Sequence, residues 1–355
     1  MGRWGVGRFH FGRRNALHPQ LSEDFDANPG RPVRLVRGMC DGYLAEPMNT
    51  FTRRRFLQGT GVLLAAPFGL GSYAFAIEPG FRLDLTSYHV APRNWPEGLV
   101  IKAAVIADIH ACEPLMPASR VRSIAEFTNR LQPDIIFILG DFNAGHRMVS
   151  APVFPQQWGE ALSVLRAPLG VYAILGNHDL WHGALPGMRS DGGASIQKAL
   201  RHANIKLLEN EAFRLEKDGS PFWVAGLADQ LGHRVGRYRF QGLDDLPGTL
   251  RQVSDDAPVI LLAHEPFIFR HVPKRVALTL CGHTHGGQVD LPFFTAAYLN
   301  TRWGDDYVYG HIVDDDRHMI ISAGLGTSIV PVRFLCPPEL VHVTIGRPVG
   351  GQTVA

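Results

Sequence analysis

The chain has 355 residues, of which 45% are hydrophobic and 19% charged, a composition typical of a globular protein with a sizeable core. Its formal net charge of +2 hides an asymmetry, because residues 1–76 hold ten Arg and five acidic residues, leaving 25 basic and 28 acidic residues beyond. That remainder, at a formal −3, offers no basic platform for nucleic acid, and the sequence shows no repeats or low-complexity tracts.

The first feature in chain order is a candidate export signal. Residues 52–58, TRRRFLQ, resemble a twin-arginine motif; an apolar stretch follows at 61–75, and residues 74–76, AFA, match a small-x-small cleavage site. A transmembrane helix is the alternative, but the stretch is short for a bilayer and contains Pro67 and three Gly. We therefore predict export by the twin-arginine translocation machinery to the periplasm or the outer face of the cytoplasmic membrane, without a stable transmembrane span.

These features divide the chain into three parts. Residues 48–76 are the predicted signal peptide, and residues 77–355 are predicted to form one folded domain. Residues 1–47, rich in Arg, Gly and Pro, are interpreted either as a disordered leader or as an artefact of an upstream start, because Met48 lies just before the motif. Cleavage would leave three of the four Cys, which allows at most one disulfide.

Five short polar blocks follow, each directly after a short apolar run. The blocks are DIH at 108–110, GD at 140–141, GNHD at 176–179, His264, and GHTHGGQ at 282–288. The runs lie at 103–107, 135–139, 171–175, 259–263 and 276–280. Short apolar runs rich in branched residues and bounded by turn residues indicate buried strands. Since ligands bind at the carboxyl edge of open α/β sheets, we expect the five blocks to meet in one site.

The remaining pattern indicates an α/β fold. Helices are predicted at 121–131, 158–165 and 194–203, and further strands at 205–208, 212–215, 222–227, 308–313, 319–322 and 340–345. Alternating strands and helices favour partly parallel sheets, and the strand-rich second half adds antiparallel partners. Residues 228–257, with several Gly and Pro, are interpreted as a surface insertion or lid.

The order of the five blocks resembles the signature of the calcineurin-like metallophosphoesterases over roughly residues 100–345. The C-terminal part resembles a bacterial, twin-arginine-exported phosphodiesterase branch, with HEP at 264–266, GLGTS at 324–328 and PVRF at 331–334. The resemblance implies a four-layer α/β/β/α sandwich of two mixed sheets over residues 77–355. It also implies a dinuclear metal-dependent phosphoester hydrolase that uses a metal-activated water.

Carried over position by position, the resemblance implies two divalent metal ions. One falls to Asp108, His110, Asp141 and His285, and the other to Asp141, Asn177, His264 and His283. Asp141 would bridge them, and His178, which is no ligand, would stabilise developing charge or protonate the leaving group. The donor set of carboxylates, imidazoles and one carboxamide suits Mn, Fe or Zn. Taken singly, each residue has an ordinary alternative as a satisfied polar group or part of a turn.

One departure bears on the substrate. In the protein-phosphatase branch the Gly-Asp block continues to a further Asp and Arg, whereas residues 142–145 here read FNAG. Arg333 is a candidate replacement contact for substrate phosphate, with a structural ion pair as its alternative. We expect a small-molecule or lipid phosphoester substrate, specifically a phosphodiester or pyrophosphate of the envelope or on a lipid carrier. The alternatives are a broad phosphomonoesterase and a catalytically inactive metal-binding scaffold.

Overall fold

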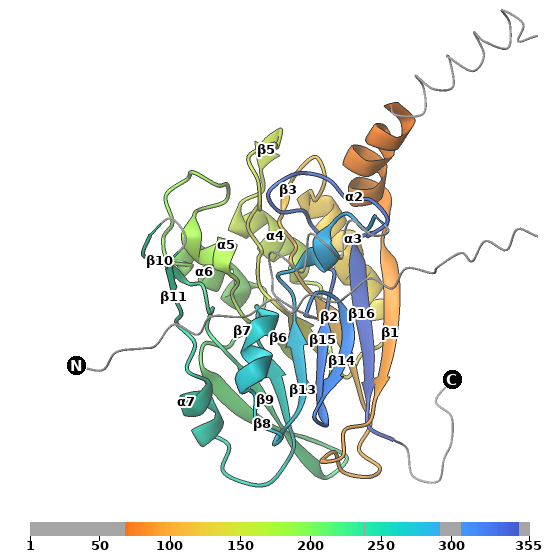
Figure 1. The fold of residues 1–355 in the computed structure, drawn as a ribbon, viewed down its shortest axis with the longest axis vertical. Coiled ribbons are helices and arrows are strands. Elements are labelled where there is room, and N and C mark those ends of the chain that lie inside the picture. The colour runs from red at the N-terminus through yellow and green to blue at the C-terminus, as the bar shows by residue number, and fades with distance from the viewer. Residues whose placement is uncertain (1–67, 237–238, 292–306, 348–355) are drawn as a thin grey trace, which may run out of the picture. The chain divides into compact units, whose positions relative to one another are not determined.

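The computed structural model describes residues 68–236, 239–291 and 307–347. The predicted leader at 1–47 and the twin-arginine motif lie outside the described residues. Within them, two six-stranded mixed sheets pack face to face, with helices on their outer faces (Figure 1). The predicted four-layer α/β/β/α sandwich is confirmed.

The first sheet has the strand order β1-β16-β2-β4-β6-β7. Its strands are β1 (Asp84–Val90), β16 (Glu339–Ile345), β2 (Ile101–Ile106), β4 (Ile135–Ile138), β6 (Val171–Ala173) and β7 (Lys206–Leu207). β16 pairs with β2 antiparallel, and every other pair in this sheet is parallel. In the β2–β4 pair, Ala103 lies opposite Ile135.

The second sheet has the order β14-β15-β13-β12-β9-β8. Its strands are β14 (Gly310–Asp314), β15 (Arg317–Ile321), β13 (Val276–Cys281), β12 (Val259–Leu262), β9 (Ser220–Gly226) and β8 (Glu211–Lys217). The four central strands are parallel and the two edge strands antiparallel. Each sheet therefore has four neighbouring parallel strands whose carboxyl ends lie at one edge.

Helices cover both outer faces. α3 (Ala118–Arg130), α4 (Pro155–Leu162) and α6 (Ala194–His202) pack on the first sheet, and α7 (Leu246–Arg251) and the 3₁₀ helix η2 (Pro266–His271) on the second. α3 buries Val121, Ile124, Ala125 and Thr128, the spacing of one helical face. A third cluster, with Phe137 and Ile260 among its members, fills the space between the sheets.

Some elements differ from the sequence prediction. The edge strand β1 was not predicted, because its polar sequence DLTSYHV is only partly buried. Two bridge-like strands, β3 (Cys112–Glu113) and β5 (Ala151–Pro152), were also missed. The prediction of a surface insertion at 228–257 fits the first half of this segment, which forms the small hairpin of β10 (His233–Arg234) and β11 (Phe240–Gln241). For the second half the prediction is wrong, because α7 buries Leu246 in the core of the second sheet.

The described chain begins with a helical segment at 68–81, which ends in the π-helical turn η1 (Tyr73–Ile77) and α2 (Glu78–Phe81). This segment overlaps the predicted cleavage site and contacts the domain: Arg333 N donates to Ala74 O at 2.9 Å. The buried Glu78 carboxylate accepts from the backbone N–H groups of Leu335 and Cys336. Among the described residues, no helix combines the length and apolarity that crossing a bilayer requires.

Candidate metal centre

The carboxyl ends of five strands bring the predicted blocks together. Asp108 follows β2, Asp141 follows β4, His264 follows β12 and His283 follows β13. Asn177 begins the short helix α5 (Asn177–Trp181) just after β6. Because β2, β4 and β6 are parallel, as are β12 and β13, their ends share one edge of each sheet. All of these side chains are buried or nearly so.

The backbone at the site is strained. Five of the predicted ligands have φ in the left-handed region, which non-glycine residues seldom adopt: Asp108 (49°), His110 (44°), Asp141 (53°), His283 (70°) and His285 (55°). Such conformations cost roughly 1–3 kcal/mol each and persist where the surrounding structure imposes them. Their concentration at one sheet edge indicates that the fold holds these side chains in place for a function.

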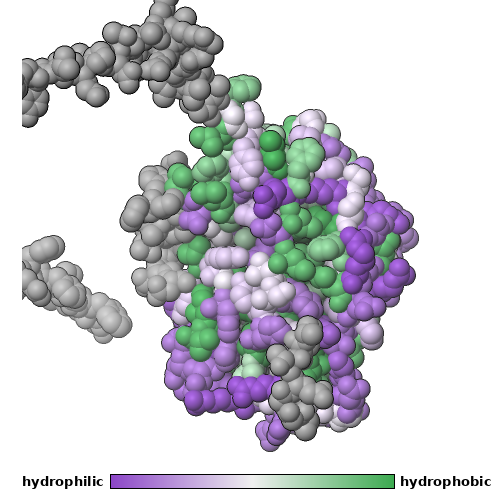
Figure 2. Space-filling model, turned by 90° about the vertical axis from the view of Figure 1, so that its right-hand side faces the viewer, coloured by the Kyte–Doolittle hydropathy of each residue, from purple (hydrophilic) through white to green (hydrophobic). Residues whose placement is uncertain are grey.

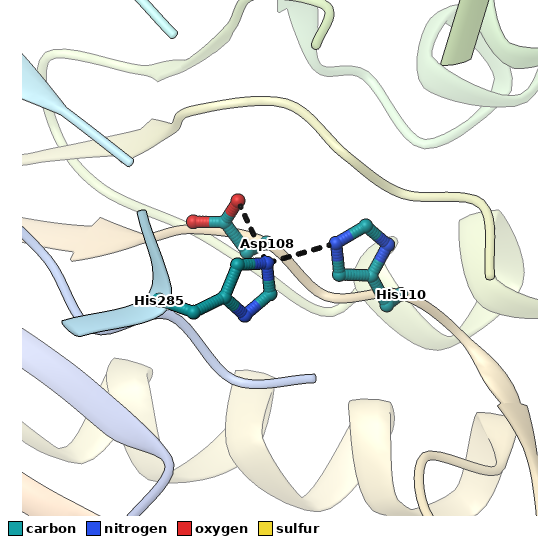
Figure 3. Close-up of side chains that lie close together, drawn as sticks. All are labelled: Asp108, His110 and His285. Atoms are coloured by element: carbon teal, nitrogen blue, oxygen red, sulfur yellow. Dashed lines mark hydrogen bonds and ion pairs between the residues drawn. The ribbon is translucent and has the colours of Figure 1, made fainter. Parts of the chain in front are cut away.

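The first donor group consists of Asp108, His110 and His285, whose ligand atoms lie within 4.8 Å of one another. His285 Nε2 lies 3.1 Å from His110 Nε2 and 3.6 Å from Asp108 Oδ1, and Figure 3 shows it between the two. His110 Nδ1 lies 2.7 Å from Asn143 O, and since a carbonyl only accepts, Nδ1 carries the proton. In the neutral ring, Nε2 is then left as the donor atom for a metal.

The second donor group consists of Asp141, His264 and His283, also within 4.8 Å. Asn177 Oδ1 lies 2.9 Å from His283 Nδ1, which adds the carboxamide oxygen. His264 Nδ1 donates to Leu139 O at 2.6 Å, which turns Nε2 toward the group. Asp141 Oδ2 lies 3.2 Å from His264 Nε2 and 3.4 Å from His110 Nε2, so one carboxylate oxygen faces both groups.

The electrostatics of the two groups fit divalent cations. Burial lowers the pKa of His110, His283 and His285, which keeps these imidazoles in the neutral form that binds metals. His264 differs: burial lowers its pKa, but the Asp141 carboxylate outweighs this and raises it above its usual range. The site therefore favours positive charge beside Asp141. His264 Nε2 makes no hydrogen bond in the described part of the chain, so a cation there would satisfy a buried polar atom.

His178 stands beside the two groups, its ring centroid 5.0 Å from that of His110. His182, which the sequence analysis missed, holds it: His182 Nδ1 donates to Gly183 O at 2.8 Å, so its Nε2 accepts from His178 Nδ1 at 3.0 Å. His178 Nε2 then accepts from Ser328 Oγ at 3.2 Å. Burial lowers the pKa of His178 to about 3. His182 thus fixes the tautomer of His178, with the proton on Nδ1.

Asp179 is a second residue whose role the sequence did not reveal. Its two carboxylate oxygens accept from four backbone N–H groups, at distances of 2.8–3.1 Å. The donors are Asp141, Phe142, Asn143 and Gly176. The buried carboxylate thereby ties the loop after β4 to the loop after β6. The only signal in the sequence was the acidic fourth position of the GNHD block.

We expect Asp179→Ala to weaken the metal centre without touching a proposed ligand. The change leaves four buried donors unsatisfied, each at about 1–3 kcal/mol, so the free energy of unfolding should fall by at least ~3 kcal/mol. Metal affinity should fall by about 10–100-fold, the usual effect of losing an outer-shell partner. Chemical denaturation and metal titration measure both. The matched control is Asp191→Ala, which removes a carboxylate that accepts from Gly193 and Ser195 at the surface. Equal behaviour of the two variants would contradict the role.

Arg333 is enclosed next to the first donor group, its Nη2 lying 3.4 Å from His285 Nδ1. It is fully buried, and its guanidinium donates to the backbone carbonyls of Ala323, Gly324, Gly326 and Cys336 at 2.7–3.1 Å. The loop it holds packs closely on the first donor group, since a Cβ at Gly324 (φ +68°) would lie 2.7 Å from Asp108 Cβ. This geometry disfavours the predicted contact of Arg333 with substrate and favours a structural role. That role differs from the predicted ion pair, because the guanidinium donates to backbone carbonyls and not to a carboxylate.

Replacing Arg333 by Met separates the two roles. The variant keeps the apolar stem but leaves several buried carbonyls without donors, so we expect the free energy of unfolding to fall by about 3 kcal/mol. KM for a phosphodiester, measured on the folded fraction, should stay unchanged. Arg214→Met, at an exposed residue paired with Asp255, serves as the control. A rise in KM of tenfold or more at unaltered stability would instead support a substrate contact.

The geometry agrees with comparisons to known proteins. The family model described as calcineurin-like phosphoesterase matches residues 101–287, which contain all five blocks except the last residue of the final one. The chain belongs to the calcineurin-like phosphoesterases. It is therefore a metallophosphoesterase, a phosphoric ester hydrolase by family, and each of its two buried groups of Asp and His side chains has the donor atoms to hold a metal ion.

Among curated relatives, an uncharacterized metallophosphoesterase of Aquifex aeolicus is 32% identical over 285 residues, covering 78% of this chain and 96% of the relative. The uncharacterized metallophosphoesterase YkuE of Bacillus subtilis is 29% identical, covering 84% and 99%. The phosphodiesterase YaeI of Escherichia coli is 27% identical, covering 83% and 99%. The similarity thus spans the metallophosphoesterase domain in full-length relatives.

Proposed function

We propose that this metallophosphoesterase is a dinuclear enzyme that hydrolyses phosphodiester or pyrophosphate bonds of an envelope or lipid-linked metabolite. The observation that carries the proposal is the position of Asp141 Oδ2, 3.2 Å from His264 Nε2 and 3.4 Å from His110 Nε2. A carboxylate shared by two donor groups is the arrangement that holds two cations together. When bound, two such cations, Mn, Fe or Zn, polarise the phosphoryl group and lower the pKa of a bound water.

The residues of this chain supply the rest of the chemistry. Asp108, His110 and His285 would hold one cation, Asn177, His264 and His283 the other, with Asp141 between them. His178, beside the first group, would stabilise developing charge or protonate the leaving group, and the latter role requires a second proton, on Nε2, because the neutral ring carries its proton on Nδ1. Ser328 Oγ and His182 keep that ring in one orientation. The presence of this non-ligand residue and its support favours an enzyme over an inactive scaffold.

Two observations support a diester over a phosphoprotein. The segment after Asp141 lacks the Asp and Arg of the protein-phosphatase branch, and Arg333 does not replace them in the site. YaeI, similar over most of its length, is described as a phosphodiesterase. The test is hydrolysis of bis-p-nitrophenyl phosphate and p-nitrophenyl phosphate by the metal-loaded protein. We expect the diester to turn over faster, whereas preference for the monoester would favour the broad phosphomonoesterase.

Export is part of the proposal and has its own test. If the twin-arginine motif acts as its resemblance implies, the protein folds and takes up metal in the cytoplasm before crossing the membrane. Arg53→Lys with Arg54→Lys should then leave a full-length, active, metal-loaded enzyme in the cytoplasm. Fractionation, activity and elemental analysis give the readout. A retained protein that is metal-free and unfolded would refute metal loading in the cytoplasm. Continued export of the variant would refute the twin-arginine route.

A further inference from the structure

Large apolar side chains project into solvent from loops near the donor groups and from the helical segment at 68–81. We define the apolar rim as Phe81, Met148, Met188, Ile329 and Leu335, whose exposed fractions lie between 41% and 82%. Isolated apolar residues on a surface are ordinary, but a gathered set marks an interaction site. Figure 2 shows hydrophobic residues gathered in the upper part of the face, next to the helical segment at 68–81.

Contacts between neighbouring loops join the segments that carry the rim. Ile329 N donates to Gly145 O at 3.1 Å, which joins the 327–330 loop to the loop that carries Met148. A Cβ at Gly187 would lie 2.8 Å from Arg147 Nη2, so the loop that carries Met188 abuts the same segment. On the other side, Leu335 N donates to the Glu78 carboxylate at 3.1 Å, which joins the 333–335 loop to the helical segment.

One part of the rim adjoins the metal centre itself. Ser328, directly before Ile329, contacts His178 Nε2 at 3.2 Å. Thr327 Oγ1 lies 3.0 Å from His146 Nε2, and Gly326 N donates to Asp108 O at 2.7 Å. The loop that presents Ile329 therefore lies against both His178 and the first donor group.

The composition of the rim fits a lipid surface. Arg147 and Arg189 are exposed directly beside Met148 and Met188, a mixture of apolar and basic groups that suits the headgroup region of an anionic bilayer. The rim consists of apolar side chains that come from separate segments of the chain. Such a surface suits a fluid bilayer better than a rigid protein partner, which requires matched packing.

We infer that the apolar rim docks on an anionic lipid bilayer, with the metal centre opening toward the lipid headgroups. This deepens the proposed function, because a lipid-linked phosphoester would be presented at the mouth. The docking itself rests on the rim and not on the reaction. A test of orientation at the bilayer therefore fails or succeeds separately from a test of hydrolysis.

The experiment places a fluorescent label at three sites of the full chain in a Cys40→Ser background, since Cys112, Cys281 and Cys336 are buried. Met148→Cys and Leu335→Cys report the rim, and Val313→Cys is the matched control. The exposed fractions are 55%, 57% and 57%. Val313 lies near the β14–β15 turn, at the end of those strands away from the site.

The labelled chains are mixed with phosphatidylglycerol and phosphatidylethanolamine vesicles, with and without lipids brominated in their acyl chains. We expect the protein to float with the vesicles, and brominated lipid to quench labels at 148 and 335 several-fold more than the label at 313. Vesicles of phosphatidylcholine alone should bind it several-fold more weakly. Failure to float would overturn the inference. So would binding in which the rim labels stay unquenched, because another segment then holds the chain, or in which the 313 label is quenched equally.

Discussion

Asp141→Asn should abolish turnover and lower the metal content of the protein together. Asp141 Oδ2 faces His110 and His264 at 3.4 and 3.2 Å, and Oδ1 accepts from His178 N at 2.9 Å. A neutral carboxamide, with one oxygen in place of two, cannot serve both cations and that backbone donor. Because the charge that holds two cations together is lost, we expect kcat to fall by about 10³-fold or more.

The measurement is elemental analysis alongside steady-state kinetics on bis-p-nitrophenyl phosphate. Asp245→Asn is the control, because Asp245 is a carboxylate that caps the remote helix α7. The control should keep both metal and activity. Two metals per chain in Asp141→Asn would show that the residue does not bridge.

His178→Gln should keep both metals while kcat falls by about 10²–10⁴-fold, the usual contribution of a general acid or base. His178 lies beside the donor groups, but its two ring nitrogens contact His182 and Ser328. Its loss should therefore remove proton transfer or charge stabilisation and leave the ligands in place. Elemental analysis and kcat on a diester with a poor leaving group test this.

The leaving group distinguishes the two chemical roles of His178. An activated leaving group such as p-nitrophenolate needs little protonation, so it should partly rescue the variant if His178 is the general acid. Equal losses for good and poor leaving groups would instead assign it to charge stabilisation. Near-normal turnover of a poor leaving group would remove His178 from the catalytic machinery.

The positions of the site residues were predictable because each block follows a buried strand. The apolar runs before Asp108, Asp141 and His264 proved to be β2, β4 and β12, and the topology of parallel strands brings their ends to one place. Helix α3 was likewise predictable, since Val121, Ile124 and Ala125 recur at helical spacing and lie on its buried face. The arrangement of two sheets was available only through the family resemblance, because alternating strands and helices fit several α/β folds.

The supporting residues were not predictable, because their roles depend on contacts between loops. Asp179 accepts from backbone groups more than 30 positions away, and His182 acts through a neighbouring ring. Nothing in the pattern around Arg333 showed that its guanidinium would be buried among carbonyls. The apolar rim has no sequence signature at all, since Met148, Met188 and Ile329 become neighbours only when three loops meet.

The most direct test of the account is metal-dependent diester hydrolysis by the full chain. Protein stripped of metal and then reloaded with Mn²⁺, Fe²⁺ or Zn²⁺ is assayed on bis-p-nitrophenyl phosphate, with metal content counted in the same samples. We predict that activity returns as the content approaches two metals per chain, and that Asp141→Asn shows neither. A wild-type protein that carries two metals and hydrolyses neither the diester nor the monoester would contradict the account.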